Sequence, residues 1–420
     1  MKLISVFEHQ RLTVGTDGFS EDHRDALERF LGDSDEEKFP YYTLIHRGVK
    51  FRHYVGAICV GDLTIEVLPK TDNDGDDDEC RWQQCLVNML SKVYKLDVKA
   101  PTDVAQTLQR SPILDIFINK FLNEVDRLLN RGLVKCYHRV DGNSKALKGK
   151  LLIGKQVTKN FVHKERFYVR QTTYDHEHSL NCILRQALTI IPKVTNNLML
   201  RGRANTLLFN FPELHEIAVT PELFSRLEFD RKTEDYREAV KIAQLLLLHF
   251  RPSNSSGRYD IMALMFDMNK LWEEYVYLEL RRNAPLEYDV KAQQKEYLWI
   301  SDSRSVSIKP DIFIIREKGT FILDTKWKRP RDNRPSDGDM HQMYAYLKLF
   351  NAEKVALIYP ATDTTETING HFIDGDKNCD LVFLSLFDKA SAENHLLESS
   401  KIVQPIWEWV KTPALHSSAH

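Results

Sequence analysis

Two neighbouring strand-like segments in the last third of the chain constrain its fold most. Residues 307–315 and 320–327 are rich in isoleucine and phenylalanine, and a short turn around Glu317-Lys318-Gly319 separates them. This pattern predicts a β-hairpin with a buried face. Asp311 opens the first strand and Asp324 lies late on the second. We therefore expect both carboxylates beside each other at one end of a sheet.

Lys326 adds a positive charge to the same place. Side chains alternate along a strand, so Asp324 and Lys326 point to the same face. Two acids buried side by side are costly unless a cation neutralises them. Carboxylate oxygens suit Mg²⁺, and Mn²⁺ as an alternative, and Mg²⁺ bridges to phosphate oxygens. Lys326 can orient or help to deprotonate an attacking water and offset charge in the transition state. These residues predict hydrolysis of a phosphodiester bond.

A helix predicted over 339–350 supplies two further candidates. Gln342 and Tyr346 are one helical turn apart, which places an amide and a phenol on one face. Basic residues between the hairpin and this helix are expected to contact DNA phosphates at the mouth of the site. These residues are Lys328, Arg329, Arg331 and Arg334. The alternative is an ordinary hairpin with exposed acids, in which a Lys326–Asp324 surface pair contributes little to stability.

The rest of residues 251–420 predicts an α/β domain. The sequence Pro252-Ser-Asn-Ser-Ser-Gly257 is a linker by composition, and we place the main domain boundary there. A helix is expected from about Met262 to Arg282. Beyond the hairpin and the 339–350 helix, we expect strands at 355–359 and 380–385 and a helix near 394–411. This order predicts a mixed sheet flanked by helices.

Two further regions precede that domain. Residues 1–75 are expected to form a β-rich module, because 54–60 and 63–68 flank Gly61-Asp62 as in a two-residue hairpin. Residues 76–250 are expected to be mainly helical. The amphipathic helices that we expect there are 78–95, 113–129, 179–191 and 234–250. Gly132 follows the second of these and suits a C-cap.

Residues 145–170 form a basic stretch inside the mainly helical region. They contain eight Lys or Arg and a single acid, Glu165. Phe161, Phe167 and Tyr168 lie among them at near-alternate spacing, which favours strand core. The cations could contact DNA phosphates or the acidic face of a partner protein.

Composition excludes several classes of protein. The 58 Lys and Arg against 60 Asp and Glu give a net charge of −2, so any contact with nucleic acid must come from local patches. The six cysteines contain no CxxC pair, which argues against a disulfide framework or a zinc site. No apolar run approaches the length of a membrane span, and the N-terminus lacks a secretory pattern. We expect a cytoplasmic protein without a membrane partner.

The motifs together resemble a nuclease superfamily. Pro310-Asp311, Asp324-Thr325-Lys326 and the later Gln342-x-x-x-Tyr346 are similar to the PD-(D/E)xK nucleases, in their RecB-like branch. More closely, the chain resembles the McrC family, the nuclease subunits of McrBC modification-dependent restriction systems. The stretches that support this resemblance are 60–70, 147–151, 266–276, 342–346 and 356–360.

This resemblance implies a role for each site residue. Residues 251–420 would form a restriction-endonuclease-like domain in which Asp311, Asp324 and Lys326 are catalytic, supported by Gln342 and Tyr346. Asp311, Asp324 and Thr325 would be the residues at the metal. The helix before the hairpin often contributes a glutamate in this superfamily. Glu273 is our first choice for it, and Glu274 is the rival.

The resemblance also implies a partner. McrC proteins bind an AAA+ partner of the McrB type, which hydrolyses GTP and recognises methylcytosine, and the partner-binding part lies in the first half of the chain, here 76–250. The sequence contains no GxxxxGK[ST] loop, in agreement with a subunit that is not itself the GTP motor. We expect a Mg²⁺-dependent endonuclease of double-stranded DNA. The alternatives are a non-cutting subunit that activates the partner GTPase and a stand-alone RecB-like repair nuclease.

Overall fold

The structure is a computed structural model of the full chain. It describes residues 2–32, 40–71, 79–94, 112–195, 197–251, 260–302, 304–317, 319–362, 366–373, 377–388 and 396–413. The linker expected at 252–257 lies outside the described residues. In the described part of the chain, no helix is long and apolar enough to cross a membrane.

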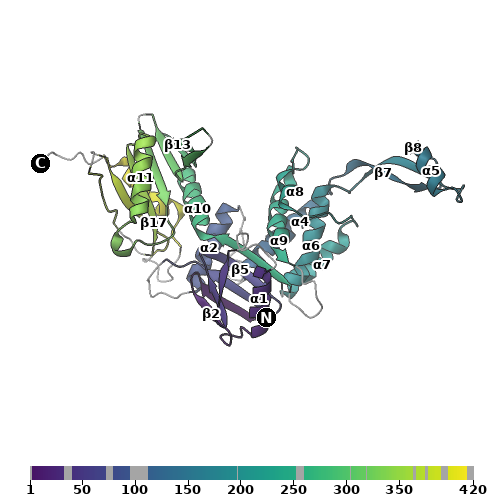
Figure 1. The fold of residues 1–420 in the computed structure, drawn as a ribbon, viewed down its shortest axis with the longest axis horizontal. Coiled ribbons are helices and arrows are strands. Elements are labelled where there is room, and N and C mark those ends of the chain that lie inside the picture. Colours follow the sequence, from purple (N-terminus) through teal and green to yellow (C-terminus); the bar gives the residue numbers. More distant parts are fainter. Residues whose placement is uncertain are drawn as a thin grey trace. The chain divides into compact units, whose positions relative to one another are not determined.

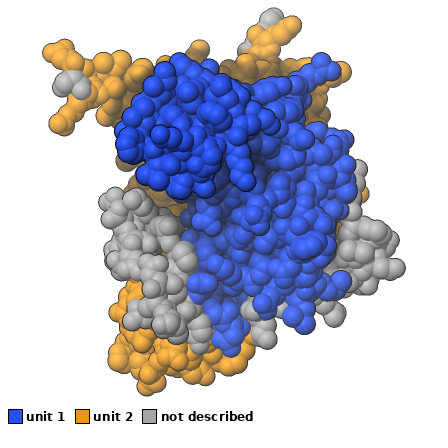
Figure 2. Space-filling model, turned by 90° about the vertical axis from the view of Figure 1, so that its right-hand side faces the viewer, with its two compact units in different colours: residues 1, 58–64, 114–264 blue, residues 2–57, 65–113, 265–420 orange. Residues whose placement is uncertain are grey.

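The chain forms two compact units (Figure 2). Unit 1 contains residues 58–64 and 114–264, and unit 2 contains residues 2–57, 65–113 and 265–420. The chain therefore passes between the units several times. The three consecutive domains expected at 1–75, 76–250 and 251–420 stay a prediction.

A mixed five-stranded sheet organises the C-terminal part of unit 2. Its strand order is β12 (Asp289–Ala292), β15 (Ile312–Arg316), β16 (Gly319–Thr325), β17 (Lys354–Ala361) and β18 (Cys379–Ser385). The first three strands are antiparallel, whereas β16, β17 and β18 are parallel. The α/β class with a mixed sheet is thus confirmed. The strands expected near 355–359 and 380–385 are β17 and β18.

Three helices pack against this sheet: α10 (Met268–Arg282), α11 (Asp337–Leu349) and α12 (Ser399–Lys411) (Figure 1). The helix expected to begin near Met262 begins six residues later, because Ile261–Asp267 forms strand β11. The side chain of Asp267 accepts hydrogen bonds from the backbone N–H groups of Asn269 and Lys270. This N-cap fixes the start of α10. The apolar run before it is buried on both faces, which the helical pattern could not reveal.

The strand expected over 307–315 is two strands. β14 (Ser305–Ile308) pairs with β13 (Glu296–Ile300) in a separate two-stranded sheet, and β15 begins only at Ile312. Lys309, Pro310 and Asp311 lie between them. Proline has no N–H to donate to a neighbouring strand, so the ladder is interrupted at this position.

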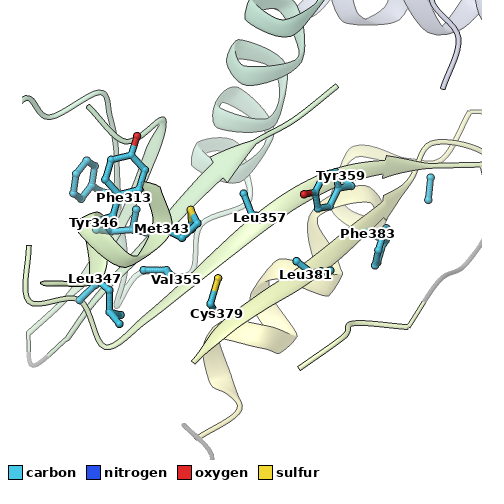
Figure 3. Close-up of a cluster of buried hydrophobic side chains, with 13 residues drawn as sticks. Phe313, Met343, Tyr346, Leu347, Val355, Leu357, Tyr359, Cys379, Leu381 and Phe383 are labelled. Carbon is cyan, nitrogen blue, oxygen red and sulfur yellow. The ribbon is translucent and has the colours of Figure 1, made fainter. Parts of the chain in front are cut away.

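A compact apolar core joins the sheet to α11 (Figure 3). Phe313 of β15 and Ile322 of β16 pack with Met343, Tyr346 and Leu347 of α11. All of them are almost completely buried. This packing holds α11 beside the ends of β15 and β16, where the acids lie.

The β-rich N-terminal part contains two sheets. One has the order β1 (Lys2–Phe7), β6 (Leu63–Leu68), β5 (Tyr54–Val60), β11 and β10 (Phe250–Arg251). The other has the order β2 (Arg11–Thr13), β4 (Gly48–Phe51) and β3 (Tyr42–Ile45). The expected strands at 54–60 and 63–68 are confirmed as β5 and β6. Helix α1 (Glu21–Gly32) lies between β2 and β3 in sequence and was not expected, whereas α2 (Glu79–Val93) was.

Helices form most of unit 1. They are α4 (Ile113–Arg131), α6 (Ser179–Val194), α7 (Leu198–Asn210), α8 (Pro221–Ser225) and α9 (Arg237–Leu248). Gly132 has a φ of 90° directly after α4, as its expected role as a C-cap requires. The helices expected at 113–129, 179–191 and 234–250 are thereby confirmed.

A β-element interrupts the helices of unit 1. It consists of β7 (Cys136–Ser144), β8 (Lys150–Leu151), α5 (Ile153–Lys159) and β9 (Phe167–Asp175), which together we call the arm (Figure 1). Phe167 and Tyr168 lie on β9 as expected. Phe161 does not lie on a strand and is exposed, so its assignment to strand core was wrong.

Candidate active site

The β15–β16 hairpin brings the two predicted aspartates together. Ile312 is opposite Leu323 at the end of the ladder that is farthest from the turn. Asp311 and Asp324 are the next residues in that direction and so lie opposite each other. The backbone N–H and the hydroxyl of Thr325 donate hydrogen bonds to Oδ2 of Asp311, at 2.7 Å and 2.9 Å. Thr325, expected at the metal, thus fixes the carboxylate of Asp311.

Lys326 lies in a ring of oxygen atoms. Its Nζ is 2.8 Å from Oδ2 of Asp324 and 3.4 Å from Oδ1 of Asp339. Nζ also donates to Oε1 of Gln342 at 3.4 Å. The backbone N–H of Lys326 is bonded to the carbonyl of Ile358 on β17, which fixes the position of its main chain. The structure therefore brings Asp311, Asp324 and Lys326 to one end of the sheet.

Gln342 and Tyr346 close the ring from α11. Nε2 of Gln342 donates to the hydroxyl of Tyr346 at 2.6 Å. That hydroxyl lies 3.2 Å from the carbonyl oxygen of Lys309 and 3.5 Å from Oδ1 of Asp324. The two residues predicted to share a helical face do so, and both contact the acid–lysine group.

Burial makes the two aspartates hard to ionise. Asp324 is 2 % exposed. Burial, and then the charge of Asp311, raises the pKa of Asp324 to about 6. Burial, and then the charge of Glu273, raises the pKa of Asp311 to about 6, although the hydrogen bonds from Thr325 act the other way. Raised pKa values in a group of convergent polar residues are typical of functional sites.

Lys326 keeps its proton in these surroundings. Burial lowers the pKa of Lys326. The negative charges of Asp324 and then Asp339 raise it by more than burial lowers it, so the pKa lies above its usual value. Burial raises the pKa of Asp339, but the hydrogen bond from Ser336 and the charge of Lys326 outweigh it, so that pKa is lowered. Asp339 therefore supplies a stable negative charge to Lys326.

Of the two glutamates considered on α10, Glu273 faces the site. Its charge raises the pKa of Asp311, and its Oε1 accepts a hydrogen bond from Nε2 of Gln293 at 2.5 Å. The backbone N–H of Gln293 in turn donates to the carbonyl of Asp311. Glu274 instead acts on Tyr94, whose pKa its charge raises.

The basic residues expected to contact DNA are spread over the segment between β16 and α11. Lys328 lies close enough for its charge to lower the pKa of Asp339. Arg329 is half-buried and Arg334 is exposed, and neither forms an ion pair with Asp311, Asp324 or Asp339. Arg331 lies in the short helix η2 (Arg331–Asn333).

Sequence reasoning missed Asp339 and Gln293. Ser336 caps α11 by accepting a hydrogen bond from the N–H of Asp339, and its hydroxyl donates to Oδ2 of that residue at 2.6 Å. The Ser-x-x-Asp spacing is a recognisable start of a helix and could have identified Asp339. Gln293 has no such signal, because it reaches Glu273 only through the tertiary fold.

A tryptophan behind the site links it to the N-terminal strand. Trp327 directly follows Lys326 and packs against Trp272 and Trp82, with ring centroids 5.4 Å and 6.5 Å away. Its indole N–H donates to Oε1 of Glu8 at 2.6 Å. The same oxygen accepts a hydrogen bond from the backbone N–H of Lys70 at 3.0 Å. Sequence patterns give no sign of this contact across more than 300 residues.

The donor set has the chemistry of a magnesium site. Mg²⁺ prefers oxygen ligands and is commonly held by one or two carboxylates, with water and substrate phosphate completing its shell. Asp311 and Asp324 supply such a pair. Oδ2 of Asp324 is buried and receives no hydrogen bond of favourable geometry, although Nζ of Lys326 is near. Among the residues described, no group of three or more His, Cys, Asp or Glu could hold a metal.

Comparisons with known proteins agree on one family. Residues 49–360 match the family described as McrBC 5-methylcytosine restriction system component. Among curated proteins, the chain is similar to the type IV methyl-directed restriction enzyme EcoKMcrBC of Escherichia coli K12. The two are 22 % identical over 273 residues, which is 59 % of this chain and 78 % of the relative.

A solved structure is similar over nearly the whole chain. It is a chain from the tetradecameric assembly of Thermococcus gammatolerans McrB AAA+ hexamers with bound McrC. The TM-score is 0.69 at 21 % identity, and the match covers 97 % of this chain and 100 % of that chain. At this identity the similarity shows a common fold.

Proposed function

Because the chain belongs to the McrBC 5-methylcytosine restriction system component family, we propose that it is the subunit of such a system that cuts DNA. In this proposal the C-terminal α/β part is a PD-(D/E)xK nuclease domain that hydrolyses phosphodiester bonds of double-stranded DNA with Mg²⁺. The observation that supports it most is the convergence of Asp311, Asp324 and Lys326 at one end of the mixed sheet.

The protein residues have distinct tasks. Asp311 and Asp324 would hold Mg²⁺, and Thr325 keeps the carboxylate of Asp311 in place. When bound, Mg²⁺ supplies a Lewis acid that activates water and polarises the phosphate. Glu273 faces Asp311 and joins the site through Gln293. Glu273, rather than Glu274, is therefore our choice for the glutamate contributed by α10.

Lys326 acts as a cation. Its raised pKa means that it is protonated at neutral pH and cannot itself remove a proton from water. An ammonium group in this position orients the attacking water and stabilises the negative charge that develops on the phosphate oxygens. Gln342 and Tyr346 restrict the position of that ammonium group and of Asp324.

We also propose a partner, an AAA+ GTPase of the McrB type. The similar fold comes from an assembly in which McrC is bound to McrB hexamers, and the arm of unit 1 has the properties of a contact element. Ile153, Val157 and Phe161 are exposed there beside many basic residues. An exposed combination of apolar and charged side chains is typical of a protein interface.

Plasmid cleavage tests the proposed function. Wild type and Asp324→Ala would be compared with Mg²⁺ and GTP, with and without the AAA+ partner, on methylated and unmethylated plasmid. We expect cutting that requires the partner and Mg²⁺ and that falls at least about a thousandfold in the variant, because a metal ligand is lost. GTPase stimulation by the variant should match wild type.

Other outcomes would favour the alternatives. Cutting by the chain alone, abolished in Asp324→Ala, would indicate a stand-alone repair-type nuclease. If wild type raises GTP turnover but never cuts, the chain is a regulatory subunit. Loss of partner binding in Asp324→Ala would show that this residue is needed for assembly and not for chemistry alone.

A further inference from the structure

The β13–β14 hairpin presents apolar side chains on both faces. Tyr297, Leu298, Trp299 and Ile300 follow one another along β13, and each is between 49 % and 67 % exposed. Tyr297 is opposite Ser307 and Trp299 is opposite Val306, with a bulge between the two aromatic residues. Because Ser307 and Val306 are neighbours on β14 and point to opposite faces, Tyr297 and Trp299 lie on opposite faces of the hairpin, and neither face is covered. In the described part of the chain, β13 and β14 pair only with each other. Exposed aromatic and aliphatic residues in such a run indicate a contact surface.

This hairpin directly follows β12, the edge strand of the sheet that bears the aspartates. β12 ends at Ala292, which is paired with Ile312, the residue after Asp311. The next residue, Gln293, donates its backbone N–H to the carbonyl of Asp311 at 3.1 Å. On the return path the carbonyl of Lys309 lies 3.2 Å from the hydroxyl of Tyr346. Both ends of the hairpin are therefore attached to the candidate active site.

The charges around the hairpin favour a polyanion as its ligand. Between residues 291 and 309 there are four basic residues and two acidic ones. The basic ones are Lys291, Lys295, Arg304 and Lys309, of which Lys291 is paired with Asp289 at 3.1 Å. Lys309 and Arg304 are exposed, at the foot and near the turn of the hairpin. Phosphate groups on either side of an inserted ribbon would meet such cations.

We infer that the β13–β14 hairpin inserts into a groove of the DNA duplex and places Tyr297 and Trp299 against the bases beside the bond that is cut. This inference rests on the proposed function. A two-stranded ribbon is narrow enough to enter a DNA groove. Aromatic and aliphatic side chains that enter between base steps unstack them and bend the duplex.

DNA binding without cleavage tests this inference separately from the nuclease reaction. All proteins would be full-length, carry Asp324→Asn to prevent cutting, and be bound to the AAA+ partner. Fluorescence anisotropy measures affinity for a labelled methylated duplex, and 2-aminopurine placed in that duplex reports unstacking. Trp299→Ala and Tyr297→Ala should each bind roughly 5- to 100-fold more weakly, as loss of a base–aromatic stack predicts. The Asp324→Asn parent should increase the 2-aminopurine fluorescence of the duplex when it binds, and this increase should be absent with Trp299→Ala and with Tyr297→Ala.

Two controls separate stacking from a general loss of apolar surface. Trp299→Phe keeps an aromatic ring and should restore most of the affinity. Leu286→Ala removes an exposed apolar side chain outside the hairpin and should bind as the Asp324→Asn parent does. Unchanged affinity and unchanged 2-aminopurine signal in Trp299→Ala would overturn the inference. A change in oligomeric mass with unchanged DNA binding would also overturn it, because the hairpin would then be a contact between copies of the chain.

The two proposals can fail independently. If wild type with Mg²⁺ cuts no DNA while the hairpin variants lose binding, the proposed function is wrong and the DNA-binding hairpin stands. If wild type cuts and the variants bind normally, only the hairpin inference is wrong.

Discussion

The ammonium group of Lys326 is surrounded by oxygen atoms from three other residues. Asp324, Asp339 and Gln342 all lie within 3.4 Å of its Nζ. A buried cation is tolerated only when such partners compensate for the lost hydration. The same partners hold Lys326 in one position, which a group that stabilises a transition state requires.

Replacing Lys326 by methionine should therefore remove activity and leave the fold intact. Methionine keeps much of the side-chain volume and removes the charge. We expect cleavage to fall about 100- to 1,000-fold, in the range seen when one stabilising donor is removed from an active site. Single-turnover cleavage with the partner and Mg²⁺ measures this. Stimulation of GTP turnover is the control, and Lys326→Met cleaving within a few-fold of wild type would contradict the assigned role.

The two aspartates make both stability and activity depend on pH. The pKa of each is about 6 in the folded protein and lies near 4 in an unfolded chain. The folded state thus binds more protons between these values, and the free energy of unfolding should fall as pH rises from about 4 to about 6. In Asp324→Asn one of these groups is absent. The fall in the free energy of unfolding between about pH 4 and about pH 6 should therefore be smaller in Asp324→Asn than in wild type, by about 1–2 kcal/mol.

Urea unfolding of the metal-free proteins at pH 5 and pH 7 measures this difference. Mg²⁺ should stabilise wild type at pH 7 more than at pH 5, because it binds the ionised carboxylates. Cleavage should rise over the same interval. Identical pH dependence of stability in wild type and Asp324→Asn would show that Asp324 is not the titrating group.

At the level of elements, α11 determines whether the site is assembled. Its apolar face packs on β15 and β16, while its first three turns supply Asp339, Gln342 and Tyr346 in that order. Ser336 fixes where the helix begins. A shift of that start by one residue would rotate Asp339 and Gln342 away from Lys326, since each residue turns the helix by about 100°.

Ser336→Ala should expose this dependence. Loss of the cap is expected to cost about 0.5–2 kcal/mol of stability. Cleavage should fall as well, because Asp339 loses the hydroxyl that orients it. Ser336→Asp keeps a capping oxygen and should recover stability, but its charge next to Asp339 should leave cleavage low. Thermal unfolding and cleavage measured on the same samples distinguish the two effects. Full cleavage activity in a destabilised Ser336→Ala variant would contradict the proposal that Ser336 is needed to position Asp339.

Local sequence patterns gave many elements and part of the site. The β5–β6 hairpin, α2, α4, α11 and β17 follow from turn residues and apolar spacing, which act over a few residues. The β11 segment was mistaken for helix because a strand buried on both faces has no alternation. The site motif placed Asp311, Asp324, Lys326, Gln342 and Tyr346 together. Gln293 was missed because its contact with Glu273 depends on tertiary packing, whereas Asp339 carries a local signal, the Ser-x-x-Asp start of α11.

On the scale of the whole molecule, the Glu8–Trp327 hydrogen bond connects the first strand to the β15–β16 hairpin. Glu8 follows β1 directly, and Trp327 follows the Asp324-Thr-Lys motif. Both lie in unit 2. The side-chain oxygen of Glu8 that accepts from the indole N–H fixes the tryptophan, and with it the backbone next to Lys326. The β-rich module thereby contributes to the geometry of the site.

Glu8→Ala should lower cleavage and stability together. The variant leaves the buried indole N–H of Trp327 without its acceptor, which is expected to cost about 1–3 kcal/mol in urea unfolding. Glu8→Gln keeps an acceptor oxygen and should recover most of both properties. Trp327→Phe removes the indole donor but leaves the bond from the N–H of Lys70 to Glu8, so Glu8→Ala should cost less stability in the double variant than in wild type. Fully additive effects would contradict a direct coupling, and Glu21→Ala, at an exposed position of α1, serves as the control.

The strand order β1-β6-β5-β11-β10 also has a consequence for how the chain is made. During synthesis β5 emerges from the ribosome some 200 residues before β11, the strand that will cover its open edge. Until then, unpaired backbone groups of an apolar strand are available to other chains. A gene fragment that stops near residue 250 would keep that edge open permanently. Such a fragment should aggregate, whereas supplying residues 260–420 as a second polypeptide during expression should rescue its solubility.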